Sequence, residues 1–384
     1  MKNSEKYNSL IVSIFLFQFG ILLPFNKLIE VEYLYIVCTA LLLLISLIIN
    51  RLKISLYLTI ICIFIFIIFL SSYFIHSVDY STFIFITISF VVKSLSAFYV
   101  ASNKISIHNL INYLKKLSYI NLFSIIVGIF IFHINQEINY MRIGYALVPS
   151  ALILGYDVMR KENRIISLIF YLITCALMIL YGNRGVFIVL ILFLILYIIF
   201  IVKINFRNFI LLTVLIISGY FLLISEFFKS IVHLVFVNYF NGSYVLLKFN
   251  KMIEEGFVSS LSGRDDIYKD ALNYFIDSPI IGNGFGYSFS VSDTSFHNFV
   301  LQIAVEFGIV GLILFCIISL IILKILLQCN SKEWKITFLL FLSLAMGRLL
   351  VSSDIWLRTE LWIFFGLVIN YLTFNNKAGG KNEY

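Results

Sequence analysis

The sequence has few charged residues, and this scarcity sets the class of protein. Only 12% of its 384 residues are charged, whereas a soluble domain carries about 25%. Hydrophobic residues make up 61% of the chain, and the mean hydropathy is +1.01. The 40 phenylalanines and 23 tyrosines run from end to end, so one anchor or signal peptide does not explain the excess. The composition indicates an all-α polytopic membrane protein and leaves no room for a large soluble domain.

Several motifs of soluble chemistry are missing as well. The five cysteines stand singly in or beside apolar runs, with no CxxC pair and no neighbouring histidine, which excludes a disulfide framework and a zinc site. There is no P-loop and no DxD motif, because Asp265 and Asp266 are adjacent. No internal repeat of solenoid length occurs. The sequence therefore gives no sign of nucleotide chemistry.

What the chain does contain is a series of apolar stretches long enough to cross a bilayer, since a span takes about 20 residues. They predict twelve transmembrane helices joined by short loops. The twelve stretches are 8–24, 32–49, 54–73, 81–101, 117–134, 144–159, 164–181, 185–202, 208–225, 299–323, 334–351 and 355–374.

The basic residues behind the net charge of +8 are distributed as this membrane topology requires, so nucleic acid is not an expected partner. With a cytoplasmic N-terminus every inner loop is basic, and the outer side keeps few basic residues, which fixes the orientation. We therefore expect one integral membrane domain over 1–384, with both termini in the cytoplasm. Its large extracytoplasmic loop, 226–298, is expected to contain short amphipathic helices at 229–255 and 265–276, and residues 375–384 form a cytoplasmic tail.

Arginines on the outer side need an explanation, because the orientation rule disfavours them and a buried cation is costly. Arg142, Arg184 and Arg264 are the main candidates, since a guanidinium binds phosphate bidentately. Their structural alternatives are an ion pair with Glu137 for Arg142, an interfacial anchor for Arg184, and pairing with nearby acidic residues for Arg264.

Three further basic residues are given no part in a site. Arg348 and Arg358 are assigned structural roles, with Arg358 paired to Asp354 four residues earlier on a helix. Lys93, inside the fourth span, is expected to snorkel to the cytoplasmic edge or to line a polar cavity.

The segment from Pro279 is the most unusual in the chain. Its glycines at 282, 284 and 286 allow backbone amides to turn inward, although no strand precedes them and a dinucleotide fold is excluded. His297 comes at the start of a long helix, where the helix dipole favours a neutral imidazole that accepts a proton. The alternative is that His297 caps the helix with help from Thr294 or Ser295. The other four histidines, at 76, 108, 133 and 233, are interpreted as interfacial or structural. Glu306, in the outer half of the tenth span, is expected to be hydrogen-bonded or paired.

These motifs resemble one known group of proteins. "SGR" at 262–264, "PIIGNGFG" at 279–286, "HN" at 297–298 and "LQIAVEFGIVGLILF" at 301–315 are similar to the signature of the O-antigen ligase and Wzy-type polysaccharide polymerase superfamily. The resemblance in motif covers about 180–315. It implies a GT-C class glycosyltransferase of the bacterial inner membrane, with no cofactor and no metal, although Glu30 and Glu32 would be the candidates for a metal.

The resemblance also implies roles for single residues. His297 acts on the acceptor hydroxyl, and Arg184 and Arg264 hold the diphosphate of a polyprenyl-linked sugar. Arg142 matches less closely, because its spacing to Gly155 only approximates the family motif. Supporting roles fall to the three remaining motif residues, Gly263, Gly284 and Asn298.

The expected reaction is the polymerisation of undecaprenyl-diphosphate-linked repeat units into capsule or O-antigen by inverting transfer on the outer leaflet. The expected partners are the lipid-linked donor and acceptor, membrane lipid and a chain-length regulator. An O-antigen ligase is the nearest alternative, and it requires a lipid A core that nothing in the sequence indicates. A lipid-linked oligosaccharide flippase is the alternative from another class, disfavoured because the sequence shows neither repeated halves nor charges clustered at mid-depth.

Overall fold

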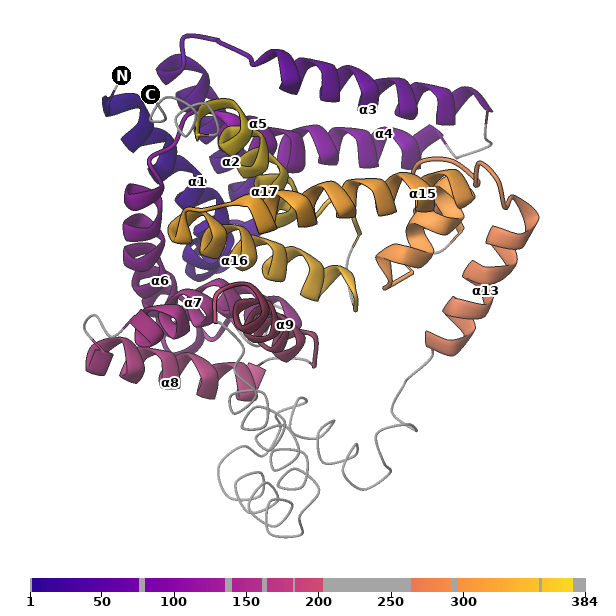
Figure 1. Ribbon diagram of the computed structural model, residues 1–384. Helices are drawn as coiled ribbons and strands as arrows, with labels where there is room; N and C mark the ends of the chain where they lie inside the picture. Colours follow the sequence, from indigo (N-terminus) through magenta and orange to yellow (C-terminus); the bar gives the residue numbers. More distant parts are fainter. Residues whose placement is uncertain are drawn as a thin grey trace, which may run out of the picture.

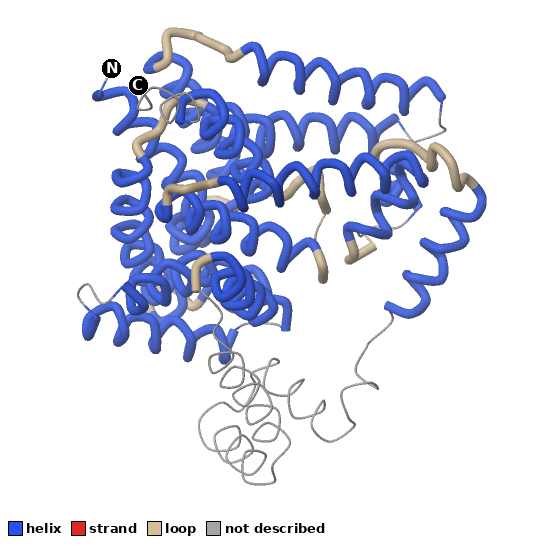
Figure 2. The backbone as a smooth tube through the Cα atoms, viewed as in Figure 1, coloured by secondary structure: helices blue, strands red, loops and turns tan. Residues whose placement is uncertain are grey.

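The computed structural model describes residues 2–75, 80–134, 140–160, 164–181, 184–202, 264–291, 296–351 and 354–375. Every regular element in these ranges is helical (Figure 2). The predicted all-α class is therefore confirmed for this part of the chain. The predicted span 208–225 and the first predicted amphipathic helix, at 229–255, lie outside the described residues.

From α1 to α9, and again from α13 to α17, the helices follow one another with short connections (Figure 1). Residues Tyr80–Ser102 form one continuous rod, in which a π-helical segment, Phe90–Leu95, separates α4 from α5. The bounds are α1 Lys2–Leu22, α2 Val31–Ile49, α3 Leu56–Ile75, α4 Tyr80–Ser89, α5 Ser96–Ser102, α6 Ile107–Phe130, α7 Tyr140–Arg160, α8 Arg164–Tyr181, α9 Arg184–Phe200, α13 Arg264–Asp277, α14 Tyr287–Val291, α15 Phe299–Gln328, α16 Lys332–Leu349 and α17 Thr359–Asn370.

Six described helices are long and apolar enough to cross a membrane, and three further apolar helices are shorter. The chain is thus a multi-pass membrane protein. The six are Asn3–Asn26, Val31–Ile49, Leu56–Tyr73, Tyr80–Ser102, Ile107–Phe130 and Phe299–Gln328. They coincide with predicted spans, because uninterrupted apolar composition is the strongest signal that a sequence carries. The total of twelve spans stays a prediction.

The second predicted amphipathic helix, at 265–276, is present as α13. It ends at Asp277, directly before Ser278 and Pro279. Proline disfavours the helical conformation of the residue that precedes it, which explains the end point. Ala271 of α13 packs against Phe296 and Val305 in a small apolar cluster of its own, so α13 is docked on the N-terminal half of α15.

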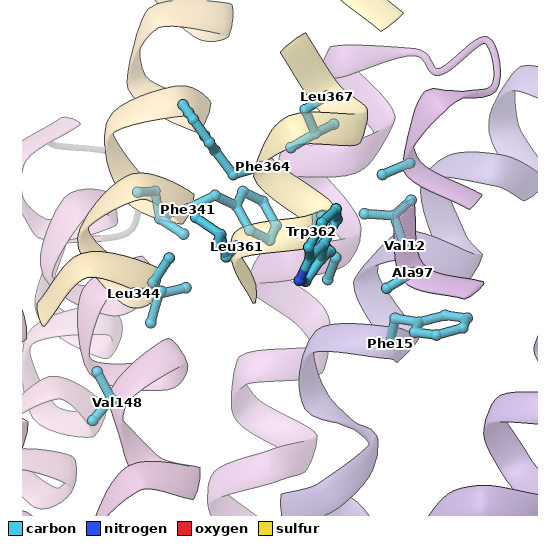
Figure 3. Close-up of a cluster of buried hydrophobic side chains, with 14 of the residues drawn as sticks. Val12, Phe15, Ala97, Val148, Phe341, Leu344, Leu361, Trp362, Phe364 and Leu367 are labelled. Carbon is cyan, nitrogen blue, oxygen red and sulfur yellow. The ribbon is translucent and has the colours of Figure 1, made fainter. Parts of the chain in front are cut away.

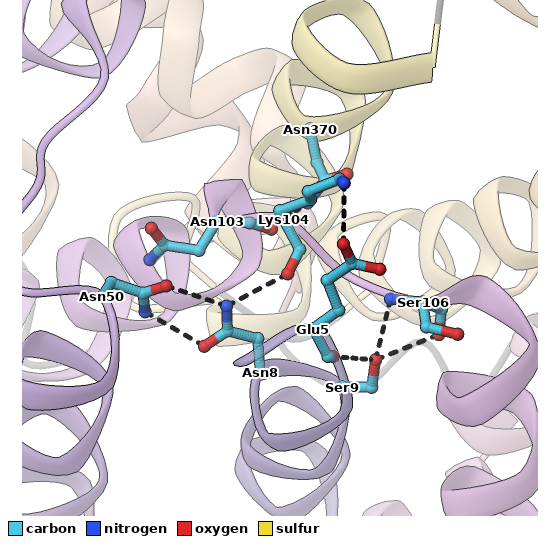
Figure 4. A network of polar contacts seen from close by, with 8 residues as sticks. All are labelled: Glu5, Asn8, Ser9, Asn50, Asn103, Lys104, Ser106 and Asn370. Carbon is cyan, nitrogen blue, oxygen red and sulfur yellow. Dashed lines mark hydrogen bonds and ion pairs between the residues drawn. The ribbon is translucent and has the colours of Figure 1, made fainter. Parts of the chain in front are cut away.

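One end of the bundle joins the start of α1 to two connections and to the end of α17, all of which the charge pattern assigns to the cytoplasm (Figure 4). Asn8 exchanges side-chain hydrogen bonds with Asn50 and donates to the Lys104 carbonyl at 3.0 Å. Lys104 forms an ion pair with Glu5 at 2.7 Å. Asn370, the last residue of α17, donates to the Asn103 carbonyl. The predicted inner segments therefore lie together.

The main apolar core is shared by helices from both ends of the chain. Figure 3 shows buried side chains of α1, α5, α16 and α17 around Trp362, with Val148 of α7 in the same core but further from it. At Gly366 a Cβ atom would come within 2.7 Å of the Phe98 carbonyl oxygen, so α17 and α5 pack backbone to backbone. This close packing sets α16, α17 and the connection between them against α1, α2 and α7.

Candidate functional site

A polar cavity of about 250 Å³ opens between the helices of this core. Its walls come from α1, α2, the π-helical segment, α7, α16 and the start of α17. The residues that α1 contributes to the lining are apolar apart from Gly20. Four basic and two acidic side chains face it together with two tyrosines. These polar lining residues are Glu32, Tyr35, Lys93, Arg142, Tyr145, Arg348, Arg358 and Glu360.

Two of the four cations have carboxylate partners. Arg142 Nη1 lies 2.5 Å from Glu32 Oε1, and both side chains are about half exposed, so this pair forms the rim. Arg358 lies deeper, with 12% of its side chain exposed, and its Nε is 3.5 Å from Glu360 Oε2. That contact is an ion pair without hydrogen-bond geometry. Nε and Nη1 of Arg358 are buried and have no hydrogen-bond partner among the described residues.

The other two cations face aromatic rings. The Arg348 guanidinium lies 4.1 Å from the centre of the Tyr145 ring, and the Lys93 ammonium lies 5.8 Å from that of Tyr35. A cation over a ring face is attracted by the π quadrupole but keeps its full charge. Within the described residues no ion pair neutralises either one, and Arg348 Nε is buried without a hydrogen-bond partner. The cavity thus carries unneutralised positive charge.

The structure corrects two pairings expected from sequence. Arg142 pairs with Glu32, 110 residues away, whereas Glu137 lies outside the described residues. Arg358 does not share a helix with Asp354, because residues 354–358 are a bent connection before α17. Local spacing cannot reveal partners that a fold brings from distant helices.

Lys93, Arg348 and Arg358 are residues that sequence reasoning left out of the site. The expectation that Lys93 snorkels to the cytoplasmic edge is wrong, and the cavity-lining alternative is confirmed. Lys93 belongs to the π-helical segment, and such bulges are frequent at functional sites because they redirect side chains. The orientation rule could have identified Arg348 and Arg358. Both were predicted on the outer side, where basic residues are disfavoured, as Arg142 was.

The glycine-rich stretch occupies a break in α15. At Gly308 the backbone leaves the helical conformation, with φ 61° and ψ −154°. Helix carbonyls and amides lose their usual partners at such a break, and inside a membrane they need replacements. Four backbone hydrogen bonds of 2.8–3.2 Å to residues 279–284 supply them. Donor first, they are Asn283 to Val305, Gly284 to Glu306, Ile309 to Pro279 and Val310 to Ile280.

Glycine is required on both sides of this junction. Gly282 (φ 73°) and Gly308 have left-handed backbone conformations, and a Cβ atom on either would lie 2.4 Å from backbone of the other segment. The amide of Gly284, one of the glycines expected to turn backbone amides inward, is bonded to the Glu306 carbonyl. Gly284 thus helps to hold α15 in its broken form.

His297 directly precedes Asn298, the residue before the first turn of α15. Its φ is 53°, a left-handed conformation that histidine adopts more readily than most residues. The cap of α15 is Asn298, whose Oδ1 accepts hydrogen bonds from the amides of Val300 (2.9 Å) and Leu301 (3.4 Å). The alternative that His297 caps the helix is therefore wrong. His297 is half-buried, and it follows a buried neighbour, Phe296.

A buried polar junction links α15 to the connection that carries Arg358. The Trp356 indole N–H donates to Glu306 Oε2 at 2.8 Å, and Ser288 and Gln302 donate to Oε1 at 2.9 and 3.1 Å. Gln302 also donates to Asp354 and accepts from the Ile355 amide. The expectation that Glu306 is hydrogen-bonded within the bundle is confirmed. Burial raises the pKa of Asp354, in the connection between α16 and α17, to about 6.

The remaining predicted site residues are placed only in part. Arg184 begins α9 and Arg264 begins α13, but their side chains, like Gly263, lie outside the described residues. Gly347, next to Arg348 on α16, packs against the Cα of Val189 on α9. Arg142 and Arg348 both line the cavity, and His297 is not among its described lining residues. Among the described residues no cluster of three metal-ligating side chains occurs.

These features define a multi-pass helical membrane protein with a cation-rich cavity and an interrupted helix stabilised by a glycine-rich loop. Residues 168–316 match the family model described as Wzy_C, O-Antigen ligase. Over those residues the chain is similar to this O-antigen ligase family, and the similarity connects it to ligase- or polymerase-type glycosyl transfer in polysaccharide biosynthesis. No curated protein and no solved structure matches the chain.

Proposed function

We propose that this protein polymerises undecaprenyl-diphosphate-linked repeat units into surface polysaccharide at the outer leaflet of the bacterial inner membrane. The observation that carries the proposal is the position of His297. It lies beside the N-terminus of a broken membrane helix, inside the segment that matches the ligase family. Both substrates are lipid-linked, which suits a site between membrane helices. Both termini are placed in the cytoplasm, and no cofactor or metal is required.

The reaction is an inverting displacement at the anomeric carbon of the donor glycan. His297 accepts the proton of the acceptor hydroxyl, the new glycosidic C–O bond forms, and the bond to the diphosphate oxygen breaks. Arg184 and Arg264 stabilise the negative charge that develops on the leaving diphosphate, the type of electrostatic help that often contributes most to catalysis. The energy stored in the donor diphosphate makes a nucleotide unnecessary. Asn298 and Gly284 support the site by holding the start of α15, and Gly263 precedes Arg264.

Two alternatives remain for the same architecture. A ligase would pass the glycan to another acceptor, such as lipid A core. A flippase would carry the lipid-linked unit across the membrane, and the break in α15 removes one argument against it, because discontinuous helices are common in transporters. The match to the ligase family favours glycosyl transfer over transport.

The test uses cells that depend on this protein for polymer. Arg264→Ala and His297→Asn are expected to abolish long polymer while single lipid-linked units accumulate on the outer leaflet. Leaflet-specific labelling of the glycan and gel analysis of polymer length measure both effects. Accumulation on the cytoplasmic leaflet would show transport instead, and unchanged polymer length would contradict the proposal. A chain-length regulator, if it acts on this protein, would shift the length distribution without abolishing it.

A further inference from the structure

We infer that the cavity lined by Lys93, Arg142, Arg348 and Arg358 binds the diphosphate of the acceptor, the incoming lipid-linked unit, at a distance from the donor diphosphate. The inference rests on the proposed function, because only a polymerase uses two lipid diphosphates at once. Apart from Arg142, it assigns a ligand to residues that the sequence motifs do not single out. Every described residue lining the cavity lies outside 168–316.

The net positive charge of the cavity favours an anionic ligand. Four cations face two carboxylates, and two of the cations, Lys93 and Arg348, have aromatic rings as neighbours in place of carboxylates. Unpaired cations inside a membrane protein are costly and usually mark a functional site. The buried Nε of Arg348, and Nε and Nη1 of Arg358, lack hydrogen-bond partners among the described residues. Phosphate oxygens would satisfy these donors, and the arginine fork matches their geometry.

The size of the cavity favours a head group over a whole glycan. Pockets for drug-sized ligands enclose about 300–1,000 Å³, and this cavity has about 250 Å³. A diphosphate fits such a volume, whereas a repeat unit of several sugars does not. Arg142 and Glu32 at the rim are half exposed, so the sugars extend out past this pair. An entering phosphate takes the place of Glu32 on Arg142.

The position of the cavity relative to His297 distinguishes the two substrates. The donor diphosphate is bonded to the carbon that reacts, so it must lie next to His297. The acceptor diphosphate is at the opposite end of the repeat unit from the reacting hydroxyl, so it must lie further away. His297 is not among the described lining residues of the cavity. The connection 354–358 runs from the Gln302 contact on α15 to Arg358 at the cavity wall. It thus connects the part of α15 that follows His297 to the cavity.

The experiment counts lipid diphosphates on the purified full-length protein. Undecaprenyl diphosphate is added in detergent, and native mass spectrometry gives the number retained per chain. Wild type is expected to retain two and the Lys93→Met/Arg348→Gln double variant one. Arg348→Lys, which keeps the charge, is expected to retain two. Lys332→Met removes an exposed charge from the other end of α16 and serves as the matched control, with two retained. Thermal midpoints of all variants verify folding.

A wild type that retains one molecule, or a double variant that still retains two, overturns the inference. A second measurement identifies the acceptor. With a lipid-linked acceptor and a diphosphate-free oligosaccharide acceptor in parallel, the ratio of the two transfer rates is expected to fall at least about tenfold in the double variant. An unchanged ratio assigns the cavity to the donor and contradicts the inference. If wild type retains two lipids but transfers no glycan to either acceptor, the proposed function fails while the lipid diphosphate site remains.

Discussion

Trp356 donates its indole N–H to the buried carboxylate of Glu306 at 2.8 Å, and this bond ties two parts of the molecule together. Trp356 belongs to the connection that leads to Arg358 in the cavity, and Glu306 belongs to the half of α15 that follows His297. Phe285 of the glycine-rich stretch packs edge-on against the Trp356 ring. The cavity, the glycine-rich stretch and the start of α15 are therefore held in one arrangement.

The first prediction concerns this junction. Glu306→Ala leaves Trp356 and Ser288 as buried donors without an acceptor, which costs about 3–5 kcal/mol of stability. Glu306→Gln keeps one acceptor oxygen and is expected to cost about 1–2 kcal/mol. Thermal unfolding in detergent, followed by tryptophan fluorescence, measures the difference. Glu333→Gln, a partly exposed change on α16, is the control. Equal effects of the two Glu306 variants would show that the junction does not depend on the hydrogen bonds.

The second prediction tests the break in α15. Gly308→Ala forces a Cβ atom to 2.4 Å from the Ile280 carbonyl in a left-handed backbone conformation. We expect a loss of at least about 3 kcal/mol, since both strain and overlap oppose the change. Gly155→Ala is the matched control, because its Cβ would lie 3.1 Å from a tyrosine side-chain atom that can shift. If both variants unfold at the same temperature, the interlocked loop is not required.

A third prediction concerns pH. Burial raises the pKa of Asp354 from 3.8 to about 6, so the folded protein binds this proton more tightly than the unfolded chain does. The associated stability is fully present below the unfolded pKa and is lost as the pH rises through about 6. One proton contributes a slope of at most about 1.4 kcal/mol per pH unit. In Asp354→Asn, the unfolding free energy measured across this pH window is expected to lack that slope. A slope that persists in the variant would contradict the assignment to Asp354.

The fourth prediction separates the backbone of His297 from its imidazole. Asparagine tolerates the left-handed conformation, so His297→Asn is expected to fold normally and to lose transfer activity by about a hundredfold or more, the usual contribution of a general base. His133 has a similar φ of 52° outside the proposed site, and His133→Asn is the matched control with normal activity. Initial transfer rates of the two variants measure the effect. Activity retained in His297→Asn would exclude His297 as the base.

Sequence patterns predicted the elements that one stretch of chain determines by itself. The apolar runs behind α1 and α15 and the end of α13 before Pro279 depend on local composition and local sterics. The glycine-rich stretch at 279–286 and the run at 301–315 in α15 were recognised as two separate motifs. Their pairing could not be foreseen, because each looks like an ordinary loop or helix until Gly308 breaks the helix and needs Pro279 and Ile280 as partners.

The cavity could not be predicted from the sequence for a related reason. Arg142 was selected because it opposes the orientation rule, and the structure places it in a polar cavity. Lys93 and Arg358 come from segments 265 residues apart in the chain, and only the packing of α17 on α5 brings them together. The partners of Arg142 and Arg358 were likewise misjudged, because nearby acidic residues in sequence were favoured over Glu32 and Glu360.

The most direct test of the central claim is reconstitution with defined substrates. Purified protein is mixed with undecaprenyl-diphosphate-linked repeat units alone, and the released glycans are sized on a gel. The account predicts a ladder that lengthens with time in wild type and is absent in His297→Asn. Repeat units that stay single with wild type, yet are transferred once an oligosaccharide core or peptide is added, would contradict polymerisation and establish a ligase.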